Sequence, residues 1–340
     1  MNLFKSTWTF SGSVASFWIQ PIRFLLVVLL CIVSSRIALA QEVFPNKPIR
    51  LVVPYPPGGT GDTVARILAP AWSELLKQSI IVENRGGAGS NIGADYVAKA
   101  APDGYTLLLF DSALAINATL YTKLPYDVSR DLTPIMVVGK APLVLVVNPS
   151  FPAKSLGELM KMIRANPAGF SYASAGSGSP VHLAAEMFKA TTGLDIVHVP
   201  YKGAGPAVID VLSGQVPMMF SVPGTVRTHI ASGKMRALAI TGPRRFDALP
   251  DIPTFIEQGV KGPEGSISIG FMVPAKTPPS IIATLHQTLS RVVATPEIVK
   301  RLGDLAYEMV VADPGQSAQI VKEETEAFGR VIRSTGVKVE

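Results

Sequence analysis

The chain has 340 residues with 31 Lys and Arg against 25 Asp and Glu, a net charge of +6. This modest positive excess does not indicate a nucleic-acid-binding protein, which needs its basic residues clustered on one face. A single cysteine excludes a disulfide framework, so the fold must depend on an apolar core, and the length allows two domains or one large one.

The N-terminal segment has the order of a secretory signal peptide. Lys5 and Arg23 precede an unbroken apolar run at 24–33, and a small-x-small cleavage site ends at Ala40. The run is far shorter than the ~20 apolar residues of a membrane-spanning helix. The long basic region leaves an uncleaved anchor as the alternative.

Cleavage after Ala40 predicts an exported, periplasmic protein of 300 residues that begins at Gln41. It removes three basic residues and leaves 28 basic and 25 acidic ones, so the net charge falls to +3. The only cysteine, Cys31, follows two leucines rather than a small residue, so no lipid anchor is predicted. The mature chain then has neither a thiol nor a disulfide.

Beyond the cleavage site, apolar runs alternate with segments of helical periodicity. The run at 49–55 predicts a strand, and residues 63–77 place Val64, Ile67 and Leu76 on one face of a helix. The first half continues with strands at 80–83 and 106–110 and a helix at 92–100. The second half predicts strands at 170–173, 196–199, 218–220 and 237–240, helices at 156–164, 181–191, 207–212 and 226–230, and closing helices at 278–293 and 316–332.

Two long apolar stretches are expected to cross between lobes. One lies at 135–147, where Gly139 and Pro142 interrupt it, and the other lies at 266–273. Alternating strands and helices over this length indicate α/β sheets with helices on both faces. The expected architecture is two α/β lobes joined by crossing strands, with residues 41–143 and 268–340 in the first lobe and 144–267 in the second.

Four loops share one design, because each ends a predicted strand, contains glycines and opens a predicted helix. They span 54–62 and 84–91 in the first half and 174–180 and 201–206 in the second. Glycine lets the backbone approach a ligand closely, and helix N-termini attract anions with their unpaired amides. Ligands of open α/β sheets bind at the carboxyl ends of the strands. The loops therefore predict a cleft of amide and hydroxyl donors that suits a carboxylate.

The residues expected to contact this ligand come from both halves. They are Pro57, Gly58, Gly59, Thr60, Asp62, Ser90, Asp111, Ser112, Ser174, Gly176, Ser177, Gly178, Ser179, His182, Tyr201 and Ser221. Asp62 also has an ordinary interpretation as the N-cap of its helix, which is favoured over a direct ligand role. No catalytic residue, metal or cofactor is predicted, and the expected function is capture without chemistry.

Several stretches match a known family. They include Pro54-Tyr-Pro-Pro-Gly-Gly, Val82-Glu-Asn-Arg-Gly-Gly-Ala-Gly, Pro102-Asp-Gly-Tyr-Thr-Leu-Leu and Val199-Pro-Tyr-Lys-Gly. From about Phe44 to the C-terminus the chain resembles the extracytoplasmic solute receptors of the tripartite tricarboxylate transporter system, the Bug receptors. The resemblance implies a periplasmic binding protein-like (type II) Venus flytrap that binds a small organic acid through backbone amides, hydroxyls and ordered water. It also implies membrane subunits of a transporter as partners, and the receptor is expected to be a monomer.

Two positions depart from the family pattern. Ser221 stands where these receptors often have an acidic residue, and Ser268 where they often have a tryptophan. Both are expected near the cleft or its hinge, so they leave the identity of the acid open. An amino-acid ligand is disfavoured, because Ser221 offers no charge to an ammonium group.

A dinucleotide-binding oxidoreductase is one alternative. Gly87, Gly89 and Gly93 follow a predicted strand, and Asp111 ends the next strand where a ribose-binding acid would stand. Against this, residues 84–86 displace the glycines from the strand end.

An exported serine hydrolase is the second alternative, with Ser177 or Ser179 as nucleophile. The Gly-x-Ser-x-Gly elbow is absent. His182 and Glu186 lie one helical turn apart and could share a metal, but a structural histidine is favoured.

Overall fold

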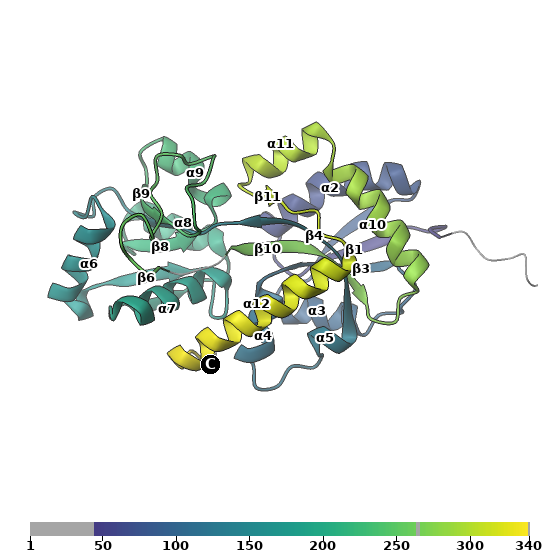
Figure 1. Ribbon diagram of the computed structural model, residues 1–340, viewed down its shortest axis with the longest axis horizontal. Coiled ribbons are helices and arrows are strands. Elements are labelled where there is room, and N and C mark those ends of the chain that lie inside the picture. The colour runs from purple at the N-terminus through teal and green to yellow at the C-terminus, as the bar shows by residue number, and fades with distance from the viewer. Residues whose placement is uncertain (1–43, 263–265, 339–340) are drawn as a thin grey trace, which may run out of the picture. The chain divides into compact units, whose positions relative to one another are not determined.

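Two β-sheets with helices packed on them organise the described chain from Lys47 onward (Figure 1). The structure is a computed structural model that describes residues 44–262 and 266–338. The predicted signal peptide, its cleavage site and Cys31 lie outside the described residues. Within residues 44–262 and 266–338, no helix combines the length and apolar character needed to span a bilayer.

The first sheet carries the first lobe. Its strands, in order across the sheet, are β11 (Glu308–Met309), β4 (Leu132–Ala141), β10 (Ile267–Pro274), β3 (Thr106–Asp111), β1 (Ile49–Val53) and β2 (Ile80–Asn84). Strands β1, β2 and β3 run parallel, whereas β10 runs antiparallel to β3 and to β4. Its helical segments are α2 (Thr60–Leu76), η1 (Ala88–Ser90), α3 (Asn91–Ala98), α4 (Ala113–Leu120), α5 (Val128–Asp131), α10 (Pro279–Val293), α11 (Pro296–Asp304) and α12 (Pro314–Thr335).

The second sheet carries the second lobe. Its order is β7 (Val197–Pro200), β6 (Ser171–Ser174), β8 (Met218–Ser221), β5 (Val144–Val147) and β9 (Arg236–Ile240). Strand β6 runs parallel to both β7 and β8, and β5 runs antiparallel to β8 and β9. The helical segments of this lobe are α6 (Leu156–Ala165), η2 (Pro167–Gly169), α7 (Pro180–Thr192), α8 (Ala204–Ser213) and α9 (Pro223–Ala231).

Apolar side chains on both faces of the strands explain why helices cover both sides of each sheet. Successive residues of a strand point to opposite faces. In β10, Met272 joins a core with Ala94 of α3, whereas Phe271 lies edge-on against Trp72 of α2 with the ring centroids 5.3 Å apart. In β5, Leu145 packs in the cluster of α6 and α7 while its neighbours pack toward α8. Such two-sided burial is typical of α/β sheets.

The two apolar stretches predicted to cross between lobes are strands that do so. Strand β4 belongs to the first sheet and continues through Pro142 and Leu143 into β5 of the second. Strand β10 returns, and its first residue, Ile267, is buried in the core of the second lobe. Gly270 in this strand admits no larger residue, because a Cβ there would lie 2.3 Å from the Met136 carbonyl oxygen. The predicted fold of two α/β lobes joined by crossing strands is confirmed.

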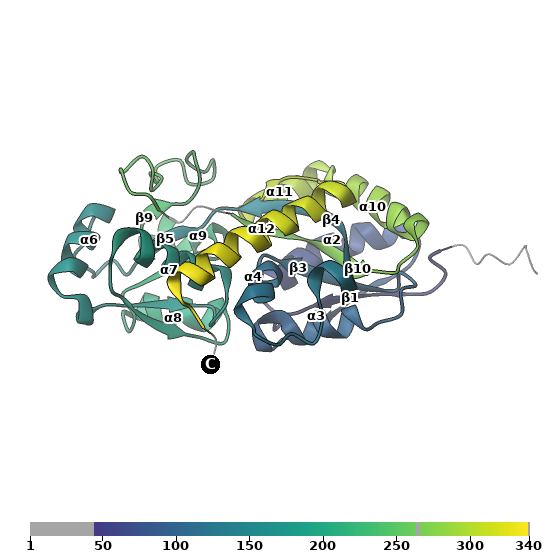
Figure 2. The ribbon, with the colours of Figure 1, turned by 60° about the horizontal axis from the view of Figure 1, so that its bottom comes forward.

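Side chains also connect the lobes on either side of the crossing strands. Leu183 of α7 is buried in one cluster with Ile116 and Leu120 of α4 and with Ile332 of α12. Figure 2 shows α12 running along the first lobe toward α7. Elsewhere an ion pair of 2.7 Å joins Arg244 to Glu308 of β11. The lobes therefore contact each other through both apolar and charged groups.

Four elements, α4, α5, α11 and β11, were not predicted from the sequence. Helix α4 has an apolar residue or alanine at six of its eight positions, and six of the eight residues are buried, so its sequence shows no one-sided period. Helix α12 begins at Pro314, two residues before the predicted start, because Asp313 and Gln316 form a capping box ahead of the apolar periodicity.

Candidate ligand-binding site

One buried carboxylate holds the loop between β1 and α2 in shape. Asp62 accepts the Gly58 amide at 3.0 Å. It also accepts Arg66 Nε and Asn84 Nδ2, each at 3.0 Å. Burial opposes ionisation of Asp62, but these hydrogen bonds outweigh it and lower the pKa of the carboxyl. The N-cap interpretation is wrong, because the N-cap is Gly59 and Asp62 is the third residue of the helix.

The start of α2 leaves donors available beside this loop. The first amides of a helix have no partner within it. The amides of Gly59, Thr60 and Gly61 and the Thr60 hydroxyl make no hydrogen bond within the described chain. Pro57, Gly58 and Gly59 are exposed. An anion can approach this cluster directly.

Two other predicted contact residues, Asp111 and Ser90, have hydrogen-bond partners within the first lobe. Tyr55 Oη donates to Asp111 Oδ1 at 2.7 Å, and the Ala113 amide donates to the same oxygen at 2.9 Å. Burial raises the pKa of both Tyr55 and Asp111. Ser90 is buried with φ +81°, and its hydroxyl receives Asn117 Nδ2 at 3.4 Å. These contacts shape the loops from within the lobe.

Ser112 is buried at the start of α4. Its hydroxyl donates to Glu324 Oε2 of α12 at 2.9 Å and accepts the Ser268 amide of β10 at 2.8 Å. The Ser268 hydroxyl donates to the other Glu324 oxygen. Burial raises the pKa of Glu324, while Ser268, Ser112 and Lys140 oppose that rise. Ser112 and Ser268 therefore join three elements where a crossing strand leaves the first sheet.

In the second lobe, the loop after β6 turns on two glycines. Gly176 has φ +125° and Gly178 has φ +81°, a region that favours glycine. The Ser174 hydroxyl is buried, receives the Gly176 amide at 3.1 Å and lies 2.6 Å from His198 Nε2. The Gly178 amide donates to His182 Nδ1 at 3.1 Å. Both glycines are thus held by side chains below the loop.

Ser177, between the two glycines, is the residue that remains accessible. It is partly exposed, and its amide and hydroxyl make no hydrogen bond within the described chain. Ser179 is not free in this way, because its hydroxyl caps α7 by accepting the His182 amide at 3.3 Å. Of the predicted residues in this loop, Ser177 alone combines exposure with a free amide and hydroxyl among the described contacts.

The remaining predicted residues of the second lobe have internal partners. The Tyr201 hydroxyl donates to Asp210. Ser221 is buried at the end of β8, where its hydroxyl donates to the Val222 carbonyl oxygen at 3.3 Å. Neither side chain presents a free donor.

The predicted residues gather at one edge of each sheet. Strands β1, β2 and β3 are parallel, and so are β6, β7 and β8, so their carboxyl ends share an edge. Helix α4 starts after β3 and helix α7 starts after β6, and they meet through Ile116, Leu120 and Leu183. Two of the helices that follow these loops therefore contact each other across the lobes.

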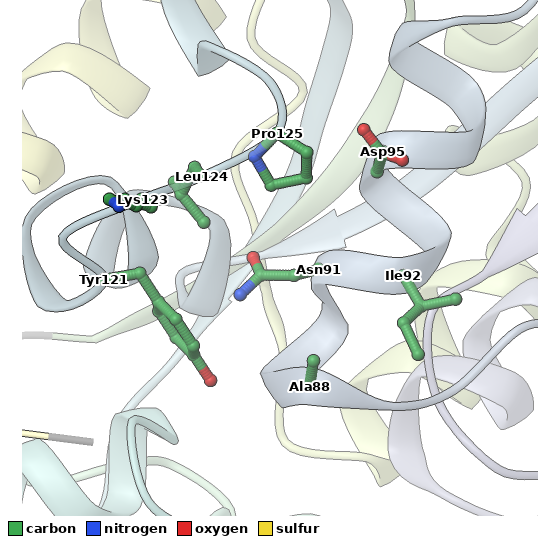
Figure 3. A pocket seen from close by; sticks show the side chains of 8 residues that line it. All are labelled: Ala88, Asn91, Ile92, Asp95, Tyr121, Lys123, Leu124 and Pro125. Carbon is green, nitrogen blue, oxygen red and sulfur yellow. The ribbon is translucent and has the colours of Figure 1, made fainter. Parts of the chain in front are cut away.

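A hollow of about 360 Å³ lies beside the β2–α3 loop, and the sequence interpretation missed it (Figure 3). It is lined by Ala88, Asn91, Ile92, Asp95, Tyr121, Lys123, Leu124 and Pro125. Its walls come from α3 and from the segment after α4. The residues that hold the loops in place through hydrogen bonds were also not identified from the sequence, among them Tyr55, Asn84 and His198. Tyr55 and Asn84 stood within the glycine-rich motifs, but nothing in the sequence marked them as supports.

The contacts around their predicted residues do not support the two alternative functions. For a dinucleotide site, η1 separates β2 from α3, and the Asp111 carboxylate is already bonded to Tyr55 and Ala113. For a hydrolase, neither predicted nucleophile is bonded to an imidazole in the described chain, because Ser177 makes no hydrogen bond there and Ser179 accepts the His182 backbone amide. Ser174, which lies 2.6 Å from His198 Nε2, is fully buried. Among the described residues, no group of three or more His, Cys, Asp or Glu side chains could hold a metal ion.

The model of the tripartite tricarboxylate transporter family receptor matches residues 64–337 of this chain. Protein BugT of Bordetella pertussis is 38% identical over 322 residues, which cover 94% of this chain and 99% of that protein.

Two similar solved structures hold ligands. A protein of R. palustris, Rpa4515, solved with adipate, is 32% identical and superposes with a TM-score of 0.83 over 87% of this chain and 99% of that one. MatC from Rhodopseudomonas palustris with bound malate is also 32% identical, with a TM-score of 0.79 over 85% of this chain and 100% of that one.

Proposed function

The chain belongs to the tripartite tricarboxylate transporter receptor family, and we propose that it captures a small carboxylate between the α2 N-terminus and the Ser177 loop. The observation that carries this proposal is the pair of free donor groups, one on each lobe. Gly59 and Thr60 supply them on the first lobe and Ser177 on the second. Relatives that hold adipate and malate support a carboxylate as the ligand.

The charge of the ligand is neutralised by dipoles rather than by an arginine. A carboxylate at the start of α2 accepts the amides of Gly59 and Thr60 and the Thr60 hydroxyl, where the helix dipole favours an anion. On the other lobe, the Ser177 amide and hydroxyl donate hydrogen bonds to a second polar group of the acid, directly or through water. Ser221 carries no charge, so an acid without an ammonium group fits best.

Closure of the lobes follows from this division of donors. An acid that touches both loops makes more contacts in a closed form than in an open one, and only such a difference in affinity shifts the equilibrium. The rotation is proposed to occur in the crossing strands, with residues 41–143 and 268–340 moving as one lobe and 144–267 as the other.

The location proposed for the receptor is supported by its N-terminal sequence, and the proposed partners by its family. It is exported, cleaved after Ala40 and released as a monomer into the periplasm, where it delivers the acid to membrane subunits of a transporter and catalyses no reaction. N-terminal sequencing of the exported protein should give Gln41 as the first residue. A mature form that retains Cys31 would contradict this proposal.

A thermal-shift screen of the mature protein against mono-, di- and tricarboxylates and aromatic acids tests the function. A ligand that binds only the folded state raises the melting temperature by mass action. Ser177→Ala should weaken binding of the acid that gives the largest shift by about 1–2 kcal/mol in calorimetry, because it removes one charge-assisted hydrogen bond. Ser150→Ala, in the second lobe but away from its glycine loop, is the matched control. No shift with any acid would contradict the proposal.

A further inference from the structure

Three aromatic rings are stacked directly below the Ser177 loop. The rings of Tyr172 and His198 have centroids 4.9 Å apart, and those of His198 and His182 have centroids 3.9 Å apart with an angle of 15° between the planes. The Tyr172 hydroxyl donates to Glu186 Oε1 at 2.6 Å, and Lys189 Nζ lies 3.0 Å from the same oxygen. The stack is therefore anchored at its tyrosine end by an ion pair on α7.

Each imidazole of the stack is connected to one glycine of the loop. His182 Nδ1 accepts the Gly178 amide directly at 3.1 Å. His198 Nε2 lies 2.6 Å from the Ser174 hydroxyl, which in turn receives the Gly176 amide at 3.1 Å. The two connections flank Ser177 on both sides, and neither imidazole is needed to contact a ligand.

We propose that His182 and His198 are positioning residues that hold Gly176 and Gly178 so that Ser177 presents its amide and hydroxyl to the ligand. The effect on ligand binding rests on the proposed function, whereas the hydrogen bonds between the imidazoles and the loop do not. Because glycine has a wide choice of backbone conformations, a loop with two glycines at positive φ loses much entropy when ordered. The imidazoles supply the bonds that order it before the ligand arrives.

The role requires a neutral imidazole at His182. Nδ1 of His182 accepts a hydrogen bond, so the proton of the neutral ring must be on Nε2. Burial lowers the pKa of His182 to about 4, and the neighbouring His198 and Lys189 act in the same direction while Glu186 opposes them. Burial also lowers the pKa of His198, again with Glu186 opposing and Lys189 reinforcing the shift. Both rings therefore stay neutral at neutral pH.

Amide exchange measured by NMR tests the positioning role without any ligand. The asparagine Oδ1 can occupy the place of His Nδ1, so H182N keeps an acceptor for the Gly178 amide, whereas H182L has a similar volume and none. We expect exchange at Gly178 to be about tenfold faster in H182L, with H182N close to wild type. The Leu183 amide within α7 is the internal control for folding. Equal exchange in H182L and wild type, or in H182N and H182L, would overturn the proposal.

The ¹⁵N shifts of the His182 ring test the same claim in the unaltered protein. A protonated Nε2 and an unprotonated Nδ1 at pH 7.5 are expected, and a protonated Nδ1 would overturn the proposal even if H182L fails to fold. The second ring is tested with H198Q, in which the glutamine Nε2 can replace the histidine Nε2, against H198L. Faster exchange at Gly176 is expected only in H198L, and unchanged exchange in H198L would overturn the role of that ring.

Calorimetry with adipate and with malate at pH 7.5 tests whether the hydrogen bond from the Gly178 amide to His182 matters for ligand binding. The Kd of the acid that wild type binds should rise about tenfold in H182L and stay within about twofold in H182N. If wild type binds neither acid, the proposed function fails for these ligands, and the exchange measurements still decide the positioning role. If H182L exposes the Gly178 amide yet binds as wild type does, the positioning role is overturned and the proposed function stands.

Discussion

At the scale of single residues, Gly59 is the sharpest test of binding through backbone amides. Its φ of −76° suits any residue, and an added Cβ would meet only the Pro56 carbonyl oxygen at 3.7 Å. Gly59→Val should therefore fold normally yet block the approach of an acid to the first-turn amides. We expect at least tenfold weaker binding by calorimetry, on the order of 1.4 kcal/mol or more.

Gly59→Ala provides the graded control for that variant, since one methyl group leaves more room than three. Gly178→Val is a poorer test, because φ +81° strains any side chain there. Binding by Gly59→Val as tight as wild type would place the acid away from the α2 N-terminus.

The lowered pKa of His182 predicts how the stability of the protein depends on pH. Its pKa is about 4 in the folded protein because of burial, against about 6.5 in an unfolded chain. The unfolded state therefore binds a proton between these values that the folded state does not. The free energy of unfolding should fall as pH drops from about 6.5 to about 4. Urea titrations should show a shallower fall in H182N than in wild type, and parallel curves would contradict the assignment.

Residue roles were the least predictable part of the site. The glycine-rich spacing correctly indicated which loops gather at the sheet edges. It could not show which polar atoms are already used, because that depends on partners far away in the sequence. Asp62 accepts a hydrogen bond from Asn84, and Ser112 donates one to Glu324. Of the sixteen residues predicted to contact the ligand, Gly59, Thr60 and Ser177 combine at least partial exposure with an amide that makes no hydrogen bond within the described chain.

At the scale of elements, strands and amphipathic helices followed from periodicity, because their buried faces repeat at fixed spacing. Helix α4 did not, since Leu114, Ile116 and Leu120 are all buried and its remaining positions are mostly small or apolar. The position of α12 depends on its polar contact with β10, which periodicity does not reveal. Glu324 makes this contact through the Ser268 hydroxyl of β10, and a second one through the Ser112 hydroxyl at the start of α4.

Glu324 gives the prediction at this scale. Its pKa is raised because burial disfavours the carboxylate. The folded state then holds a proton more tightly than the unfolded state, so this group stabilises the fold at low pH and less as pH rises through its folded pKa. Glu324→Gln removes that dependence and keeps a side chain that can bond both hydroxyls. The melting temperature of the variant relative to wild type should rise between pH 5 and pH 8, and a constant difference would contradict this.

At the scale of the whole molecule, the account rests on two lobes that share a ligand. The two-lobed fold was predictable, because long apolar stretches interrupt the regular alternation where strands cross. The contacts between lobes were not, since Leu183 and Arg244 look like ordinary helix and loop residues in the sequence.

Small-angle scattering measures whether the lobes close. The radius of gyration of the mature protein should fall when a bound acid is added to saturation, because the closed form brings both donor groups to the ligand. Ser177→Ala, at an acid concentration that saturates wild type but not the variant, should show a smaller fall. An unchanged radius at saturation would mean that binding does not shift the lobes.

The most direct test is a titration of the ¹⁵N-labelled mature protein with adipate or malate, followed by amide chemical shifts. The account predicts that the largest changes occur together at Gly59 and Thr60 in the first lobe and at Ser177 in the second, with one binding constant for all three. Saturable changes confined to one lobe, or centred on the hollow beside Tyr121 while these three amides stay unchanged, would contradict capture of a carboxylate between the two loops.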